Sequence, residues 1–169
     1  MIRLDGQLAI VTGGARGIGE GICKVFCNAG AKVALWDILD SGQETADRIA
    51  ADGGDIFFQK VNITDSESVQ KATDEIMTQH GRIDILINNT QGPQGGGALE
   101  KSVNDYQEAF DLLFKSVVFT TELALKHMQQ KKWGRIVNVA SISVKEPLNY
   151  LALSNSIRAA VVTWAKSLA

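Results

Sequence analysis

Short apolar segments alternate with longer segments of helical periodicity along the whole chain. Nearly all residues of the short segments are apolar, as in parallel strands that helices cover on both faces. The strands are predicted at Leu8–Val11, Lys32–Trp36, Ile56–Val61, Ile83–Ile87 and Arg135–Val139. This alternation predicts βαβ units and therefore an α/β fold, a doubly wound parallel sheet of the Rossmann type in three layers.

Helices are expected between the strands and after the last one. Thr64 or Asp65 is the expected cap before the third helix, and Gly81 ends it. The helices are predicted at Gly17–Asn28, Gly42–Ala51 and Ser66–His80, onward from the capping box Ser102–Asp105, and from Asn149 to the end. No later strand is predicted beside the fifth one, and a bare apolar edge is an aggregation hazard. We therefore expect residues 1–169 to form one dinucleotide-binding domain without its last strands, the N-terminal part of a longer chain.

Composition and charge exclude several classes of partner. Of the 169 residues 45% are hydrophobic, and the net charge of -2 comes from interspersed acidic and basic residues. Such a pattern contains no basic patch that would bind nucleic acid or an anionic membrane. Cys23 and Cys27, with the scarce His80 and His127, lack the spacing of a zinc site, so we expect no metal and interpret the thiols as core residues in a reducing compartment. No signal peptide or spanning segment is recognisable, which predicts a cytoplasmic protein.

A glycine-rich turn, Thr12-Gly13-Gly14-Ala15-Arg16-Gly17-Ile18-Gly19, joins the first strand to the first helix. Gly13 allows a tight turn, Gly17 allows the backbone to approach a pyrophosphate, and Gly19 lets the helix lie close to the sheet. The helix N-terminus offers unpaired N–H groups and a partial positive charge to the phosphates. We include Arg16 and Ile18, which belong to the same turn, in the predicted cofactor site.

Asp37 follows Gly19 by 18 residues, at the end of the second predicted strand. An acid at this interval accepts hydrogen bonds from the adenosine ribose and repels a 2′-phosphate, which favours NAD over NADP. Two observations leave alternatives open. Asp37 is also a residue that starts turns, and the Arg16 guanidinium beside the glycine turn can pair with a 2′-phosphate.

At this point the sequence resembles the short-chain dehydrogenase/reductase family, from about Leu4 to Ala169. The glycine turn, Asp37, the segment Asn88-Asn89-Thr90-Gln91-Gly92 and the segment from Gly134 to Ser141 carry the resemblance. It implies oxidation of an alcohol or reduction of a carbonyl with a nicotinamide cofactor, and Ser141 as the active-site serine. By the same resemblance Asn62 and Ile63 meet the adenine and Asn89 lines the cofactor, although Asn88 and Asn89 are also ordinary turn formers.

The family's catalytic set of Asn, Ser, Tyr and Lys is not complete in this chain. Counting from Ser141, the tyrosine and lysine positions fall on Ser154 and Arg158, and the asparagine position falls on Phe114. A serine is a poor acid and an arginine does not release its proton, so Arg158 is expected to hold a ribose or phosphate instead. Tyr150, one helical turn before Ser154, is an alternative proton donor, or an aromatic that packs at a helix start. Divergent members of the family with such a Ser-Asn-x-x-Arg segment resemble ketoacyl reductases.

Two functions follow as hypotheses. The first is an oxidoreductase that moves hydride between NAD(H) and a small alcohol or ketone, with Ser141 polarising the oxygen and Tyr150 or water supplying the proton. The loop Thr90–Gly97 follows the fourth strand, where open α/β sheets place ligands. The second is a cofactor-binding sensor or partner subunit without chemistry. A flavin or S-adenosyl ligand fits the glycine turn but accounts less well for Asn88, Asn89 and Ser141. The resemblance also implies a homo-oligomer that forms through the fourth and fifth helices. The apolar faces of these helices are explained equally well by burial within one subunit.

Overall fold

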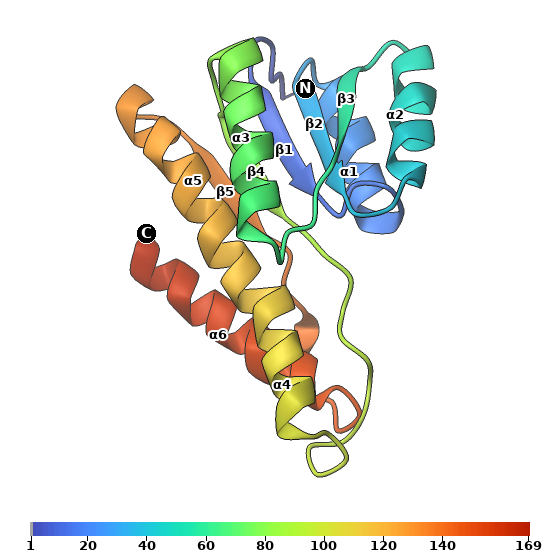
Figure 1. Ribbon diagram of the computed structural model, residues 1–169, viewed down its shortest axis with the longest axis vertical. Helices are drawn as coiled ribbons and strands as arrows, with labels where there is room; N and C mark the ends of the chain where they lie inside the picture. The colour runs from blue at the N-terminus through green and yellow to red at the C-terminus, as the bar shows by residue number, and fades with distance from the viewer. Residues whose placement is uncertain (1) are drawn as a thin grey trace.

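The computed structural model describes residues 2–169 and contains one sheet of five parallel strands (Figure 1). Its strand order is β3-β2-β1-β4-β5, so β1 and β4 are neighbours at the point where the order of the strands reverses. The strands are β1 (Leu8–Thr12), β2 (Lys32–Asp37), β3 (Asp55–Lys60), β4 (Ile85–Asn88) and β5 (Arg135–Asn138). Each lies within two residues of its predicted bounds, and the α/β fold class is confirmed.

The helices agree with the sequence where local capping sets their ends. The third helix begins as predicted, because the Asp65 side chain accepts a hydrogen bond from the Glu67 backbone N–H, and it ends at Gly81, whose φ of 66° is left-handed. The helices are α1 (Gly17–Asn28), α2 (Ser41–Ala51), α3 (Ser66–His80), α4 (Val103–Phe110), α5 (Ser116–Lys131) and α6 (Ala152–Leu168). Helix α6 begins three residues after the expected Asn149, because the intervening residues form a turn.

Two hydrophobic clusters cover opposite faces of the sheet and give the three expected layers. On one face β1 and β2 pack against α3 and α5, and on the other they pack against α1 and α2. Trp36, at the centre of the first cluster, is fully buried, and its indole N–H donates to the Gln59 side chain at 2.7 Å. The largest core side chain is therefore also satisfied as a hydrogen-bond donor.

The expectation that all five strands are covered on both faces is wrong for β3 and β5. The central strands β1, β2 and β4 are buried almost throughout, whereas residues of β3 and β5 are mostly half-buried or exposed. Val137 on β5 is 50% exposed although it is apolar. These two strands are the edges of the sheet, so each has only one neighbouring strand and part of its surface remains open.

The predicted fourth helix is interrupted by a π-helical turn. The capping box is confirmed, since the Ser102 and Asp105 side chains and backbone N–H groups bond reciprocally at the start of α4. One π-helical segment, η1 (Asp111–Lys115), then separates α4 from α5. Such a turn winds about five residues where an α-helix winds four, so it changes which side chains face the sheet. Helix α6 packs beside α4 and η1 (Figure 1).

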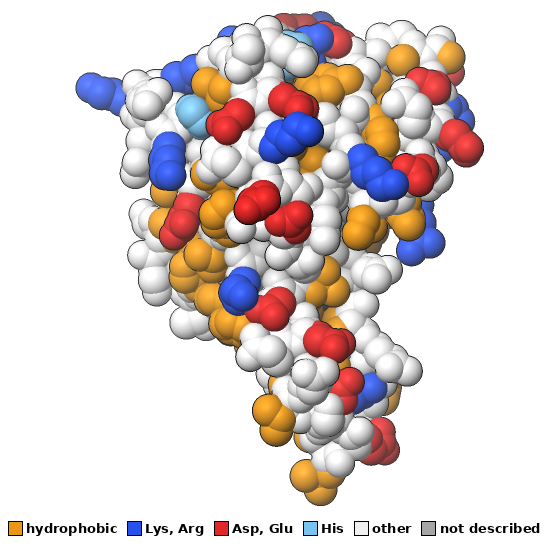
Figure 2. Space-filling view, viewed as in Figure 1, with side chains coloured by type: hydrophobic (Ala, Val, Ile, Leu, Met, Phe, Trp, Pro, Cys, Tyr) orange, Lys and Arg blue, Asp and Glu red, His pale blue; other side chains and the backbone are white. Residues whose placement is uncertain are grey.

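Charged side chains of both signs are interspersed over the face shown in Figure 2, with apolar side chains between them. Among residues 2–169, no group of three or more histidine, cysteine or acidic side chains is placed to bind a metal ion. The same residues contain no helix with the length and apolar character needed to cross a membrane.

Candidate cofactor and active site

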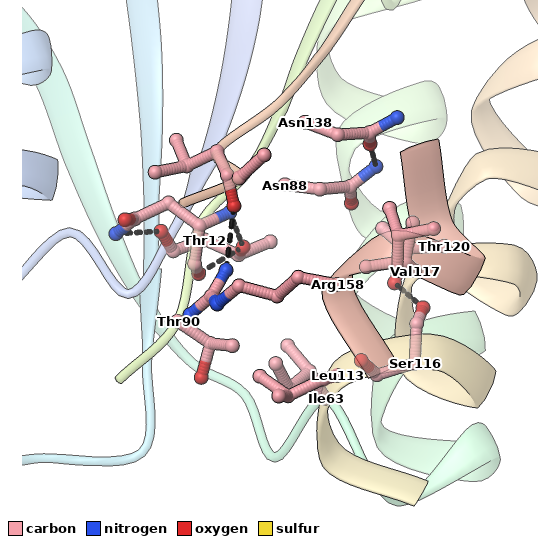
Figure 3. A pocket seen from close by; sticks show the side chains of 14 residues that line it. Thr12, Ile63, Asn88, Thr90, Leu113, Ser116, Val117, Thr120, Asn138 and Arg158 are labelled. Atoms are coloured by element: carbon pink, nitrogen blue, oxygen red, sulfur yellow. Dashed lines mark hydrogen bonds between the residues drawn. The ribbon is translucent and has the colours of Figure 1, made fainter. Parts of the chain in front are cut away.

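A cavity lies at the carboxyl ends of β1, β4 and β5, where the strand order reverses (Figure 3). Open α/β sheets place their ligands at such a point because the loops diverge there. The cavity measures about 20 Å³, room for about one water molecule. It is lined by Thr12, Ile63, Asn88, Asn89, Thr90, Leu113, Ser116, Val117, Thr120, Asn138, Val139, Ala140, Arg158 and Val161.

The glycine turn beside this cavity has the backbone geometry that its glycines predict. Gly13 and Gly17 have φ values of 61° and 58°, a conformation that other residues rarely adopt. A Cβ atom on Gly19 would overlap the Gly13 carbonyl oxygen, and one on Gly13 would lie 2.8 Å from the Asn89 carbonyl oxygen. Gly17 differs, because a Cβ atom there meets nothing within 4 Å and projects into open space.

The start of α1 fits an anionic ligand. Its N-cap residue, Arg16, has extended backbone and its side chain makes no capping hydrogen bond. The first N–H groups of a helix have no partner within the helix, and they carry the positive end of its dipole. The Arg16 guanidinium instead reaches the Gln91 side chain at 3.5 Å, across the turn toward the loop after β4. A pyrophosphate group matches the charge and the uncapped donors of this helix end.

Asn89 ties the glycine turn to the end of β4. Its side-chain amide donates to the backbone carbonyl oxygens of Thr12 and Gly13, both at 3.1 Å. The Thr12 hydroxyl donates to the Asn89 carbonyl at 2.6 Å and accepts from the Asn89 N–H at 2.9 Å. Both amide protons of Asn89 are therefore directed at the glycine turn. Asn89, which was predicted to line the cofactor, holds this turn in its observed shape.

Asp37 is buried at the end of β2, next to the glycine turn. One carboxylate oxygen accepts from the Ala15 N–H at 2.9 Å, and the other accepts from the Leu39 N–H at 3.0 Å. The hydrogen bond to the Leu39 N–H shows that Asp37 also starts a turn, the alternative role that the sequence left open. Each carboxylate oxygen retains a second lone pair for a hydroxyl group, so the turn role does not compete with a ribose.

Asn62 and Ile63 lie where the chain leaves β3, and they behave differently. The Asn62 side-chain oxygen accepts from the Thr64 N–H at 3.1 Å and from the Thr64 hydroxyl at 2.8 Å, which caps the turn before α3. Ile63 lines the cavity and packs against the core between the sheet and α3. Only the second of this predicted pair therefore reaches the cavity.

Arg158 extends from α6 into the cavity, toward Thr12 and Thr90 (Figure 3). Its guanidinium donates to the Val139 carbonyl at the end of β5, with a nitrogen–oxygen distance of 2.6 Å. Burial, which disfavours the charged form, lowers the pKa of this guanidinium from its ordinary value. The position that the resemblance assigns to a lysine thus carries a fixed, partly desolvated positive charge.

The other two predicted catalytic residues lie outside the cavity lining. Ser141 caps the short helix η2 (Ile142–Val144), accepting from the Ser143 N–H at 3.1 Å and the Ser143 hydroxyl at 2.9 Å. Tyr150 is 64% exposed in the turn before α6, and Ser154 is buried in the first turn of that helix. The structure brings Arg158, Asn89 and Ile63 to one cavity without Ser141 or Tyr150 in its lining.

Phe114, the position assigned to the family's asparagine, also points away from the cavity. Its ring stacks on Phe110 with centroids 5.0 Å apart and meets the edge of Trp164 at 6.1 Å. The cavity side of this helix is instead formed by Leu113, Ser116, Val117 and Thr120. The π-helical turn at η1 contains Phe114 and lies directly before Ser116, which is where the facing side chains change.

Several polar residues of the cavity were missed from the sequence. Asn88 and Asn138 end the neighbouring strands β4 and β5 in register, and the Asn88 amide donates to Asn138 at 2.8 Å. The same amide donates to the Thr121 hydroxyl on α5 at 3.1 Å. A signal was available, because polar residues that end parallel strands gather at one edge of the sheet. Ser116 and Thr120 gave no such signal, since their placement depends on the π-helical turn.

Comparison with known proteins agrees with this geometry. A profile of the family described as short chain dehydrogenase matches residues 7–169. The chain is 33% identical to the 3-oxoacyl-acyl-carrier-protein reductase FabG of Chlamydia pneumoniae, over 99% of this chain and 68% of that protein. It is 38% identical to the oxidoreductase UcpA of Salmonella typhimurium, over 100% of this chain and 65% of that protein.

A solved structure is similar over the same region. It is a 7α-hydroxysteroid dehydrogenase complexed with NADH and 7-oxo glycochenodeoxycholic acid, with a TM-score of 0.90 and 29% sequence identity. The similarity covers 96% of this chain and 64% of that one. The chain therefore spans about two thirds of the length of the proteins that it matches.

Proposed function

Because the chain belongs to the short-chain dehydrogenase family, we propose that it binds a nicotinamide dinucleotide and transfers hydride between this cofactor and a small alcohol or ketone. The observation that carries the proposal is the uncapped start of α1, with open space at Gly17 and the buried carboxylate of Asp37 close by. The cofactor, when bound, supplies or accepts the hydride. The chain's own residues hold the cofactor, orient the substrate and transfer the proton that accompanies the hydride.

In this proposal the cofactor lies across the carboxyl edge of the sheet. The backbone of Gly13, Gly17 and Gly19 gives the pyrophosphate access to the start of α1, and the exposed Ile18 and Arg16 flank it. The adenine end lies toward Asn62 and Ile63. Asn89 acts by holding the glycine turn in place, which its hydrogen bonds to the turn support.

The preferred cofactor is NAD. The free lone pairs of Asp37 accept the ribose hydroxyls, and its negative charge disfavours a 2′-phosphate. The Arg16 guanidinium lies 3.5 Å from the Gln91 side chain in the loop after β4, which supports NADP less directly than the Asp37 carboxylate supports NAD. A cytoplasmic location is proposed on the two free thiols, Cys23 and Cys27, which a reducing compartment preserves.

Reduction of a carbonyl consumes one hydride and one proton, so a proton donor is needed besides the cofactor. Arg158 can hydrogen-bond a ligand oxygen and stabilise its negative charge, but it keeps its own proton. We assign the proton to Tyr150 or to solvent water, and the orientation of the carbonyl to Ser141. For Tyr150 this requires the turn before α6 to bring an exposed side chain to the bound substrate.

A second candidate is a cofactor-binding sensor or partner subunit without turnover. The observation that favours it is the set of residues at the family's catalytic positions, where Ser154 and Arg158 replace the tyrosine and lysine and Phe114 replaces the asparagine. The cofactor-binding turn does not depend on these positions. Binding without chemistry is therefore compatible with the same fold.

Calorimetric titration with NADH and NADPH tests the binding step. We expect NADH to bind more tightly than NADPH, and Gly17→Ala to weaken NADH binding at least tenfold, because its methyl group enters the space for the pyrophosphate. Gly6→Ala is the matched control, since Gly6 lies outside the glycine turn, has a similar left-handed φ of 69°, and a Cβ there also meets nothing within 4 Å. Absence of heat from both nucleotides would overturn the proposal.

Turnover separates the two candidates. Oxidation of NADH is followed with a panel of ketones and aldehydes, using Ser141→Ala and Tyr150→Phe as comparisons. Turnover that falls in these variants supports the oxidoreductase. Tight NADH binding with no turnover on any substrate supports the sensor or partner subunit.

We also propose that the protein is a homo-oligomer through its predicted fourth and fifth helices, which are α4 with α5 and α6 in the structure, as expected from the family resemblance. The exposed Val103 at the start of α4 and Leu168 at the end of α6 are apolar groups that such an interface would cover. Light scattering coupled to gel filtration measures the mass in solution. A monomer at micromolar concentration would contradict the proposal.

A further inference from the structure

The loop Thr90–Gly97 leads from the cavity, whose lining includes its first residue, to the turn that carries Tyr150. Near its end Gly96 forms an isolated parallel bridge with Leu151. The Gly96 N–H donates to the Tyr150 carbonyl at 2.7 Å, and the Ala152 N–H donates to the Gly96 carbonyl at 3.2 Å. These two hydrogen bonds fix the backbone on both sides of Leu151.

The bridge also replaces a missing cap at the start of α6. The N-cap residue is Leu151, whose apolar side chain accepts no hydrogen bond, so the first N–H groups of the helix need other acceptors. The Gly96 carbonyl is one such acceptor. Gly96 has a φ of 153°, a conformation that residues with a side chain rarely adopt, and a Cβ atom there would overlap the Lys101 side chain. The bridge therefore favours glycine at position 96.

Asn155 on α6 holds the same turn from the other side. Its side-chain amide donates to the Leu148 carbonyl at 2.8 Å, and the Leu151 N–H donates to that carbonyl at 2.9 Å. Asn155 is the asparagine of the Ser-Asn-x-x-Arg segment, which occupies the positions of the family's tyrosine and lysine. It does not line the cavity, so its hydrogen bond to the turn accounts for it better than a contact with the cofactor.

We propose that Gly96 and Asn155 are positioning residues, which hold the turn before α6 so that the Tyr150 hydroxyl gives a proton to the substrate. Their hydrogen bonds fix the backbone of the turn, while the exposed Tyr150 side chain can rotate toward a bound ligand. The first residue of α6 lies about 9 Å along the helix axis from Arg158, which lines the cavity. This inference rests on the proposed function and selects Tyr150 rather than water as the proton donor.

The proton transfer balances without a further reactant. The Tyr150 O–H bond breaks as hydride from the nicotinamide reaches the carbonyl carbon, and the proton moves to the carbonyl oxygen. The tyrosinate then regains a proton from water, to which the exposed side chain has access. Oxidation of the alcohol follows the same steps in reverse.

Hydrogen exchange measured by NMR tests the hold on the turn and does not require turnover. We expect Gly96→Ala and Asn155→Ala each to speed exchange of the Leu151 and Ala152 amide hydrogens about tenfold or more, the effect of one lost hydrogen bond. Unchanged exchange in both variants would overturn the proposal.

Each of these variants has a matched control. Gly92→Ala alters the same loop at a glycine where a Cβ atom meets nothing within 4 Å. Ser156→Ala removes the hydroxyl next to Asn155, which donates to the Ala152 carbonyl within α6. Both controls should exchange as slowly at the turn as the unaltered protein. Faster exchange in a control, equal to that in its test variant, would overturn the assignment to Gly96 or Asn155.

Double variants with Tyr150→Phe show whether the two residues act through Tyr150. Gly96→Ala and Asn155→Ala should each lower kcat about tenfold or more, with the Kd of NADH changed by less than about twofold, and should add little to the loss in Tyr150→Phe. Losses that multiply in the double variants would overturn the proposal, because the two residues would then act independently of Tyr150.

Failure of the proposed function is seen separately. Absence of NADH binding contradicts the proposed function, and hydrogen exchange then still decides whether Gly96 and Asn155 hold the turn. NADH binding without turnover on any substrate would overturn the positioning role, since no proton is then transferred.

Discussion

The Asn89 side-chain amide donates a 3.1 Å hydrogen bond to the Gly13 carbonyl oxygen, which joins the end of β4 to the glycine turn after β1. These residues are 76 positions apart in the chain. A Cβ atom on Gly13 would lie only 2.9 Å from the Asn89 amide nitrogen, so the close approach requires glycine on one side and a donor on the other. The glycine turn is thus shaped by a residue outside its own motif.

Replacing Asn89 tests this relationship. Asn89→Ala removes both hydrogen bonds to the turn, and we expect the free energy of unfolding to fall by about 1–3 kcal/mol, because two carbonyl groups lose their donor. NADH affinity should fall as well, since the turn is no longer held. Asn89→Asp should be at least as harmful, because a carboxylate faces the same carbonyl oxygens without a proton to donate. Urea unfolding and NADH titration measure the two effects, and unchanged values in both variants would contradict the assignment.

Two glycines of α1 should respond oppositely to alanine. Gly19→Ala places a methyl group against the Gly13 carbonyl oxygen, so we expect loss of stability and of cofactor affinity. Gly21→Ala meets open space on the exposed side of the same helix and should increase stability by about 0.5–1 kcal/mol, the difference in helix propensity. Thermal unfolding of the two variants checks this. Equal changes would mean that α1 does not lie as close to the turn as the structure shows.

Asp84 should make stability depend on pH in the acid range. It is buried before β4, where its carboxylate accepts from the Leu8 N–H at 2.8 Å and from two nitrogens of Arg82 at 2.6 and 2.9 Å. Burial opposes ionisation most strongly, but the hydrogen bonds from Arg82 and Leu8 together with the charges of Arg82 and Lys131 outweigh it, and the pKa of Asp84 is lowered. The stabilisation is therefore present above the unfolded-state pKa of about 3.9 and is lost as the pH falls through the folded-state value.

Urea unfolding between pH 7 and pH 3 measures this contribution. Asp84→Asn should lower the free energy of unfolding at pH 7 by about 1–3 kcal/mol and flatten its decline in acid. Asp52→Asn is the control, because Asp52 is exposed and forms no ion pair in the part of the chain that the structure describes. An acid decline in Asp84→Asn as steep as in the unaltered protein would assign the pH dependence to other carboxylates.

Restoring the family's asparagine at position 114 should not create activity. Phe114 packs against Phe110 and Trp164 rather than facing the cavity. We expect Phe114→Asn to lower the free energy of unfolding by about 2 kcal/mol through lost aromatic packing, with no gain in turnover. Ser116→Ala, in contrast, changes the cavity wall at little cost to packing. A gain of turnover in Phe114→Asn would show that the helix turns differently in the active protein.

The two cysteines should be unreactive in the folded protein. Burial raises the pKa of Cys23 to about 12 and that of Cys27 to about 11, so few thiolates exist at neutral pH. A thiol-specific chromogenic reagent at pH 7.5 should label neither residue quickly, and both should react after addition of urea. Fast labelling of one cysteine in the native state would contradict the packing of α1 against the sheet.

The sequence alone determined the elements that depend on short-range chemistry. Apolar runs, capping residues such as Asp65 and glycines with left-handed φ act within a few residues, so the strands, the ends of α3 and the glycine turn were predictable. The family resemblance was also visible, because it is carried by contiguous motifs. The approximate bounds of every strand follow from the same local patterns.

Only the tertiary structure decided which side chains share the cavity. Arg158 meets Val139 because α6 crosses the end of β5, and Ser116 replaces Phe114 at the cavity because a π-helical turn rotates the helix by part of a turn. Neither contact can be predicted from the local periodicity of the sequence, since each depends on packing between segments far apart in the chain. Edge strands are exposed for the same reason, because the coverage of a strand depends on its neighbours in space.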